Sequence, residues 1–132
     1  GIKARIVSYD WGTYLKKQRE QPDDMDLFQL GWTGDNGDPD NFLAVLFDGL
    51  ASPSIRTQWH NPEYHDLMIK GKITIDQAER TKIYERALQV IFDEVGTIPI
   101  AHSTVIWPAT KNVMNFKLHP TGSVRLKNVS FK

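Results

Sequence analysis

The segment 31–41 constrains the fold more than any other part of the chain. It reads Gly-Trp-Thr-Gly-Asp-Asn-Gly-Asp-Pro-Asp-Asn, so eleven positions hold three glycines, three aspartates and a proline. These residue types favour turns and irregular backbone over regular helix or strand. An apolar run, 25–30, precedes the segment, and Asp38-Pro39 can cap and begin a helix. The pattern predicts a loop between a strand and a helix, where open α/β sheets bind ligands.

The residues before this loop predict one compact α/β unit. Residues 2–8 alternate apolar and polar side chains, which is typical of a half-buried strand. Asp10 can cap a helix over residues 11–19, and a loop at 20–24 leads to a second strand at 25–30. A strand, a helix of about three turns and another strand form a right-handed βαβ unit. We therefore expect an α/β fold.

Two further helices are predicted from proline-containing start signals. The first begins at Asp38-Pro39 and ends at Gly49, and a loop covers residues 50–60. The second begins at Asn61-Pro62 and ends at Gly71. Both signals combine a side-chain cap with a proline that is already fixed at a helical φ.

A longer helix follows, running from the capping-box pattern of Thr74 and Gln77 to about Val95, where Gly96 ends it. Its polar face, predicted to be solvated, carries Glu79, Arg80, Lys82, Glu85 and Arg86. The three helices after the loop show apolar side chains at helical spacing, and these predict the core. They are Phe42, Leu43, Leu46, Phe47, Tyr64, Leu67, Met68, Tyr84, Ala87, Leu88, Ile91 and Val95.

The end of the chain has a different character. Residues 98–107 predict a strand, and residues 113–118 and 124–131 predict two more, joined by a turn at 119–122. Alternating helices and strands therefore give way to a β tail.

Composition excludes several classes of protein. Lys plus Arg and Asp plus Glu both number 16, so the formal net charge is zero, unlike that of a nucleic-acid or anionic-membrane binder. Cysteine is absent, which excludes disulfides, a thiol nucleophile and cysteine-based zinc sites. The sequence has no apolar run of about 18 residues and does not open on a signal peptide.

Asp35 is the carboxylate of the 31–41 loop without a structural task, since Asp38 is explained as a helix cap. A carboxylate beside the indole of Trp32 suits a primary ammonium group, through charge-assisted hydrogen bonding and cation–π attraction. On composition alone, a surface turn around a buried tryptophan remains the simpler interpretation.

Calcium is the alternative for the same loop. With Asn36 at position 1 of an EF-hand loop, Asp38 and Asp40 fit positions 3 and 5. Asn41 then takes the place of the required glycine and Phe47 that of the required glutamate, so the match is poor.

No other constellation predicts a metal, a cofactor or catalysis. The four histidines, His60, His65, His102 and His119, lack the spacing of a helical metal site. No nucleophile–base pair, nucleophile elbow or phosphate-binding loop is present. We expect no catalytic residue, no metal site and no cofactor.

Four segments carry a resemblance to a known family. They are residues 9–15 (Tyr-Asp-Trp-Gly-Thr-Tyr-Leu), 31–42 (the loop with Phe42), 98–104 (Ile-Pro-Ile-Ala-His-Ser-Thr) and 124–129 (Val-Arg-Leu-Lys-Asn-Val). Together they resemble the dipeptide- and oligopeptide-binding members of the extracellular solute-binding family 5, which serve bacterial ABC importers. That family also includes haem-associated and antimicrobial-peptide-associated binders.

The resemblance implies a carboxyl-terminal fragment of a two-lobed periplasmic protein about four times this length. Residues 1–105 would form an α/β ligand-binding lobe, and 106–132 a β tail that returns to the other lobe. The complete protein would bind a peptide and deliver it to a membrane permease, without being an enzyme or entering the membrane. The missing signal peptide would then reflect where the chain is cut.

The resemblance also implies roles for individual residues. Asp35 would bind the amino terminus of the peptide, and Trp32 would wall a side-chain pocket. Trp11 would line the cleft, and the backbone of Thr33 and Gly34 would meet the peptide main chain. The partner of the peptide carboxylate has no counterpart in this sequence.

Two alternatives remain. One is a haem- or other small-ligand-binding relative of the same family. The other is an interaction module with no small ligand, which would be a compact monomer. A fragment would instead expose apolar surface and could dimerise.

Overall fold

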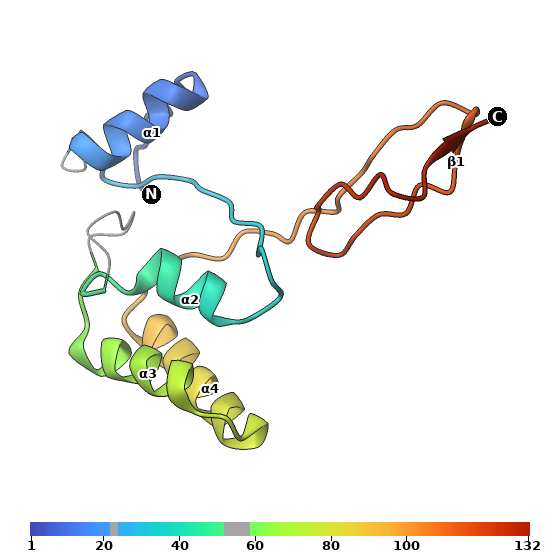
Figure 1. The fold of residues 1–132 in the computed structure, drawn as a ribbon. Helices are drawn as coiled ribbons and strands as arrows, with labels where there is room; N and C mark the ends of the chain where they lie inside the picture. The colour runs from blue at the N-terminus through green and yellow to red at the C-terminus, as the bar shows by residue number, and fades with distance from the viewer. Residues whose placement is uncertain (22–23, 52–58) are drawn as a thin grey trace.

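The computed structural model describes residues 1–21, 24–51 and 59–132. Four helices and one short ladder form this part of the chain. They are α1 (Trp11–Glu20), α2 (Asp40–Phe47), α3 (Pro62–Ile73), α4 (Gln77–Asp93), β1 (Val113–Met114) and β2 (Ser130–Phe131). Figure 1 shows α2, α3 and α4 gathered together, α1 separate from them, and the tail extending away as a long hairpin.

Side-chain caps explain where three of the helices begin. In each, one side chain accepts a hydrogen bond from the backbone N–H three residues further on, which satisfies a donor that the helix leaves free. The pairs are Asp10–Thr13, Asn61–Tyr64 and Asp76–Glu79, at 3.1, 2.9 and 2.9 Å. Hydrogen bonding from Thr13 also lowers the pKa of Asp10.

The core lies where α2, α3 and α4 meet. α3 packs along α4, and α2 packs on α3. Tyr64 and Met68 are almost completely buried, and the Tyr64 hydroxyl donates to the Leu43 carbonyl at 3.0 Å. The buried apolar cluster is Leu43, Ala44, Tyr64, Met68, Tyr84, Ala87, Val90 and Ile91. Most predicted core positions on these helices are confirmed, but Phe42 is 37% exposed, Leu88 is 52% exposed and Val95 is 69% exposed.

The helix boundaries correct two predictions. α3 runs through Gly71 to Ile73, so Gly71 does not end it; a Cβ there would lie 2.8 Å from the Tyr84 ring. Glycine is needed at this position for the close approach of α4. The predicted capping box at Thr74 is also wrong, because Asp76 caps α4 and the Thr74 hydroxyl donates to the Lys70 carbonyl at 2.7 Å.

The predicted βαβ unit is not formed by the residues that the structure describes. Among the described residues, segments 2–8, 25–30 and 98–107 enter no β-ladder, and α1 packs against no other element. Ile2 and Ile6, expected to be half buried, are 96% and 92% exposed. An alternating pattern identifies an apolar face, but a strand also needs a neighbour for its backbone groups, and the described part of this chain supplies none.

The tail forms only part of the predicted β-ribbon. β1 and β2 pair antiparallel, with Val113 opposite Phe131, and pairing stops after two residues on each side. The predicted turn at 119–122 is confirmed, with the Gly122 N–H donating to the His119 carbonyl at 2.8 Å. The loop predicted at 50–60 lies largely outside the described residues, as does part of the loop at 20–24.

Candidate ligand-binding site

The side chain of Asn41 joins the two residues predicted to bind an ammonium group. Its Oδ1 accepts a hydrogen bond from Trp32 Nε1 at 3.1 Å and another from the Asp35 backbone N–H at 3.0 Å. Its Nδ2 donates to Asp35 Oδ2 at 3.4 Å. Trp32 is half buried, whereas Asp35 is exposed. The loop therefore presents an accessible carboxylate fixed relative to an indole.

Gly34 gives this loop its tight packing. It is buried, and a Cβ at this position would fall among the ring atoms of Phe42, in the first turn of α2. The neighbouring Thr33 is exposed. A Cβ at Gly122 would lie 3.7 Å from Thr33 Cγ2, so the turn of the tail approaches the loop as well.

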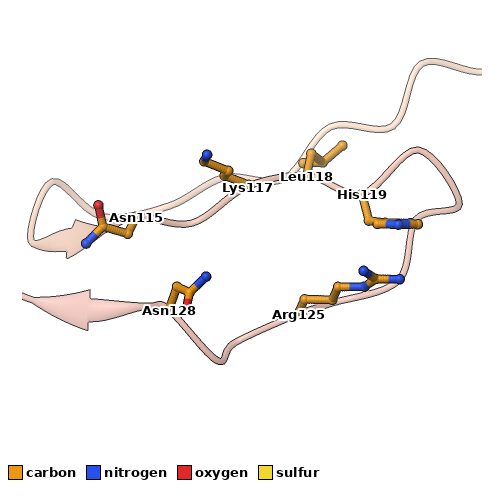
Figure 2. Close-up of a pocket in the computed structure, with 6 residues that line it drawn as sticks. All are labelled: Asn115, Lys117, Leu118, His119, Arg125 and Asn128. Carbon is orange, nitrogen blue, oxygen red and sulfur yellow. The ribbon is translucent and has the colours of Figure 1, made fainter.

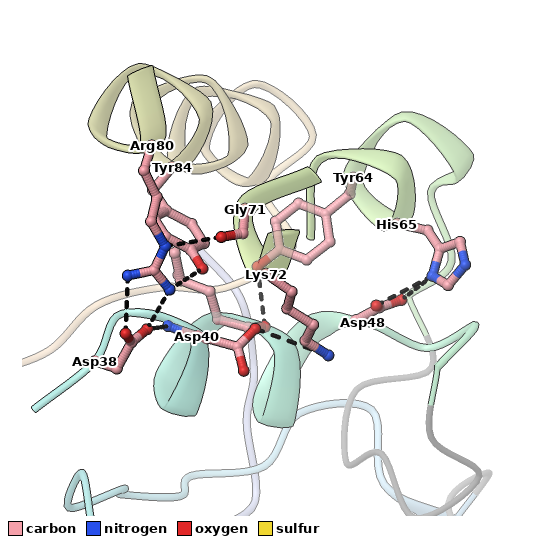
Figure 3. A network of polar contacts seen from close by, with 10 residues as sticks. Asp38, Asp40, Asp48, Tyr64, His65, Gly71, Lys72, Arg80 and Tyr84 are labelled. Atoms are coloured by element: carbon pink, nitrogen blue, oxygen red, sulfur yellow. Dashed lines mark hydrogen bonds and ion pairs between the residues drawn. The ribbon is translucent and has the colours of Figure 1, made fainter. Parts of the chain in front are cut away.

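The other end of the loop is tied to α4 through Arg80 (Figure 3). Both terminal nitrogens of the Arg80 guanidinium donate to the Asp38 carboxylate at 2.8 Å, and Nε donates to the Gly71 carbonyl at 2.7 Å. These hydrogen bonds from Arg80 lower the pKa of Asp38. Asp38 Oδ1 also accepts from the Asp40 N–H at 2.9 Å, but the N-cap of α2 is Pro39, which has no capping side chain, so the predicted cap at Asp38 is one residue too early.

Tyr84 completes this network. Its hydroxyl accepts a hydrogen bond from Arg80 at 2.9 Å, and the guanidinium carbon lies 4.9 Å from the centre of its ring. Burial raises the pKa of Tyr84, against the opposing effect of Arg80. The predicted solvated role of Arg80 is therefore wrong, because its guanidinium joins the loop to both α3 and α4.

One ion pair and one hydrogen-bonded pair flank the network in Figure 3. Lys72 Nζ lies 3.8 Å from Asp40 Oδ1. The buried carboxylate of Asp48, just after α2, meets His65 Nδ1 on α3 at 2.9 and 3.1 Å. These pairs hold α2 against α3 behind the loop.

The geometry does not favour calcium in the loop. Asp38 is engaged by Arg80 and Asp40 lies near Lys72, so both candidate ligands already face a cation. In the part of the chain that the structure describes, no three His, Cys, Asp or Glu side chains gather as metal ligands would.

Trp11 is not brought to the loop by the described contacts. It lies on α1, is 63% exposed and stacks on Tyr14 with ring centres 6.0 Å apart. α1 is connected to the chain ahead of the loop by the hydrogen bond from the Tyr14 hydroxyl to the Gln29 carbonyl, at 2.7 Å.

The described residues also form two hollows, one of which includes Pro39 at the end of the loop. One, of about 290 Å³, lies beside Arg80 and Tyr84 on α4. The other, of about 500 Å³, opens between the two arms of the tail, where longer strands were predicted (Figure 2). It is lined by Asn115, Lys117, Leu118, His119, Arg125 and Asn128. Lys117 and Arg125 bring positive charge to this lining, and residues 95–132 contain no Asp or Glu, so this hollow is basic.

The chain is homologous over its length to bacterial solute-binding proteins of the peptide-binding kind. It is 44% identical over 122 residues to di/tripeptide-binding protein 3 of Pseudomonas aeruginosa, which covers 91% of this chain and 22% of that protein. Heme-binding protein A of Haemophilus influenzae is 33% identical over 126 residues, covering 92% and 22% of the two chains. No protein-family model matches the chain.

A solved structure agrees with these similarities. The dipeptide-binding protein from Pseudoalteromonas sp. SM9913, in complex with Met-Leu, matches with a TM-score of 0.85 and 31% identity over 97% of this chain and 25% of that one. The chain thus spans about a quarter of the length of its relatives. These relatives are binding proteins rather than enzymes. Among residues 1–21, 24–51 and 59–132, no helix has the length and apolar character needed to cross a membrane.

Asn41 and Arg80 are the residues that sequence reasoning missed. Asn41 lies six residues after Asp35, in the first turn of a helix. An amide side chain at such a position can hydrogen-bond the backbone of the preceding loop. No comparable signal marked Arg80, because its partner Asp38 lies 42 residues away in the sequence.

Proposed function

We propose that this chain supplies the ammonium-binding side of a peptide-binding cleft, in the periplasmic substrate-binding component of an ABC importer. The observation that carries the proposal is the exposed carboxylate of Asp35, held beside Trp32 by hydrogen bonds to a single asparagine. The homology to di/tripeptide-binding proteins supports the same ligand class.

The physical basis is electrostatic. A primary ammonium group donates up to three hydrogen bonds, and a carboxylate is its strongest acceptor. The indole of Trp32 adds attraction for a cation and excludes water from one side. Closure of a second lobe would remove the remaining water and strengthen both contacts.

The rest of a peptide would be met by neighbouring groups. The exposed backbone at Thr33 and the turn at Gly34 would bind the peptide main chain, and Trp11 would line the cleft once α1 is in place against the remainder of the protein. Residues 1–105 would then form the ligand-binding lobe and 106–132 the tail that returns to the other lobe. Recognition through termini and main chain would tolerate many side chains.

Calorimetry on a chimera tests the proposal. In the chimera, this chain replaces the matched quarter of the Pseudoalteromonas dipeptide-binding protein, and Met-Leu is the ligand. We expect Asp35→Asn to weaken binding at least about tenfold, because one charge-assisted interaction is lost. Asp66→Asn, which changes an exposed carboxylate on α3, is the matched control. Unchanged affinity in the Asp35 variant would reject the role of Asp35.

Haem is a second candidate ligand, because heme-binding protein A of Haemophilus influenzae is among the relatives. His60 and His102 are exposed, whereas the Nδ1 atoms of His65 and His119 are hydrogen-bonded within the chain. An absorbance scan of the chimera after haem addition tests this. A Soret shift that disappears in a His60→Ala or His102→Ala variant would favour haem, and an unchanged spectrum would leave the peptide as the proposed ligand.

The isolated chain is a candidate for self-association. It exposes Ile2, Ile6, Ile75 and Phe92, each at least 77% accessible. Exposed apolar surface of this kind favours dimerisation of the isolated chain. Light scattering that finds only monomers across a wide concentration range would contradict it.

A further inference from the structure

We infer that Asn41 is the positioning residue that makes Asp35 selective for a free amino group. The inference rests on the proposed function, which assigns the ammonium group to Asp35. It adds that the selectivity depends on a side chain that makes no contact with the ligand in this role. The observation is that one amide accepts hydrogen bonds from Trp32 Nε1 and the Asp35 backbone N–H and donates one to the Asp35 carboxylate.

The orientation of the Asn41 amide is fixed by its surroundings. Its oxygen faces two N–H donors, at 3.1 and 3.0 Å, and its nitrogen faces a carboxylate oxygen at 3.4 Å. Turning the amide over would place its N–H groups against the two donors and its oxygen against the Asp35 carboxylate. Every contact would then be repulsive, so the loop accepts one orientation only.

Two of the three contacts position Asp35. The bond to the Asp35 backbone N–H fixes where the residue sits, and the bond to Oδ2 restricts rotation of its carboxylate. The other carboxylate oxygen receives no bond from Asn41 and is left to accept from a ligand. Since Asn41 also holds Trp32 Nε1, one side chain sets the relation between the acceptor and the indole face.

The anchor of Asn41 is itself well supported. It lies in the first turn of α2, which packs on α3, and the Asp40 N–H at the start of α2 donates to the Asp38 carboxylate that Arg80 holds. A carboxylate positioned by such an anchor loses less conformational entropy when it binds an ammonium group than a freely rotating one.

A double-mutant cycle in the chimera tests this inference. The variants are Asp35→Asn, Asn41→Ala and the two combined, with Met-Leu and N-acetyl-Met-Leu as ligands. Asn41→Ala should weaken Met-Leu binding about tenfold, while changing N-acetyl-Met-Leu binding less than about twofold. The double variant should bind Met-Leu no more than about twofold more weakly than Asp35→Asn alone, because Asn41 acts through Asp35.

Asn36→Ala is the matched control, since Asn36 lies in the same loop and its Oδ1 accepts only from the Asp38 N–H among the bonds described. It should leave the preference for Met-Leu over the acetylated ligand unchanged. In the 132-residue chain, the Trp32 indole N–H resonance, assigned with Trp32→Phe, should shift in Asn41→Ala and stay in place in Asn36→Ala. If Asn41→Ala loses helix content by circular dichroism, Asn41→Gln is measured instead, with the same expectation at smaller amplitude.

The outcomes separate the two proposals. An equal loss for both ligands in Asn41→Ala, or additive effects in the double variant, would overturn the positioning role while leaving Asp35 in place. An Asp35→Asn variant that keeps its preference for the free amine would overturn the proposed function and this inference with it.

Discussion

The Arg80 guanidinium meets the Asp38 carboxylate with both terminal nitrogens at 2.8 Å, across 42 residues of sequence. This fork joins the end of the 31–41 loop to the first turn of α4. The loop is therefore held by two side chains: Asn41 binds Trp32 and Asp35, and Arg80 binds Asp38. The contribution of the Arg80 contact to stability can be measured without a ligand.

Arg80→Ala should lower the melting temperature of the chain by on the order of 5 °C, because it removes the guanidinium that donates to the Asp38 carboxylate and to the Gly71 carbonyl. Arg86→Ala on the same helix is the control. Both side chains of its ion pair with Glu63 are half exposed, so Arg86→Ala should lower the melting temperature by about 1 °C or less. Equal effects of the two changes would show that the Arg80 fork is an ordinary surface ion pair.

Stability should depend on pH through Asp38. Its folded pKa lies below the ordinary value of 3.8, so the contribution is complete above that value and is lost as pH falls through the folded pKa. Urea midpoints of the wild type and Asp38→Asn, compared from pH 6 to about pH 2, should therefore converge on acidification. Asp10 titrates in both proteins and cancels in the difference. A gap that stays constant below pH 3.8 would contradict the linkage.

Gly71→Ala should destabilise the chain by about 1–3 kcal/mol, although alanine favours helices. The added Cβ would lie 2.8–2.9 Å from the Tyr84 ring and push α3 from α4. Gly12→Ala in α1 is the opposite case, because its Cβ would meet only Asp10 Oδ1 at 3.5 Å, and it should be neutral or slightly stabilising. Chemical denaturation measures both, and a stabilised Gly71→Ala variant would refute the close packing.

Val95→Gly should stabilise the chain by about 1 kcal/mol. Val95 has φ +53° just after α4, where its N–H donates to the Phe92 carbonyl and the Gly96 N–H to the Ile91 carbonyl. This is the Schellman arrangement, in which glycine is the favoured residue. Since Val95 is 69% exposed, little packing is lost. Urea denaturation tests it, and a lower midpoint for Val95→Gly would mean that the valine side chain packs more than its exposure indicates.

The sequence predicted the local features well and the long-range ones poorly. Caps at Asp10 and Asn61 were found because each accepts a hydrogen bond from a backbone N–H only three residues further on. The strands predicted at 2–8, 25–30 and 98–107 are not formed. An alternating pattern shows which side chains are apolar, but it does not show which other segment would pair with the strand. The same limit applies to the candidate site. Asp35 and Trp32 lie close in sequence and could be predicted together, whereas the contact of Arg80 with Asp38 forms only once α4 is folded.

The pairing of α3 with α4 implies an order of folding. These two helices follow each other along the chain and carry six of the eight buried apolar residues in its described part, so their contacts close after a short connection. Arg80 lies on α4, so it can bind Asp38 in the loop only after this helical hairpin has formed. Formation of the hairpin should thus precede ordering of the loop, and transient opening of α4 should release Asp38 before the Asn41 contacts are lost.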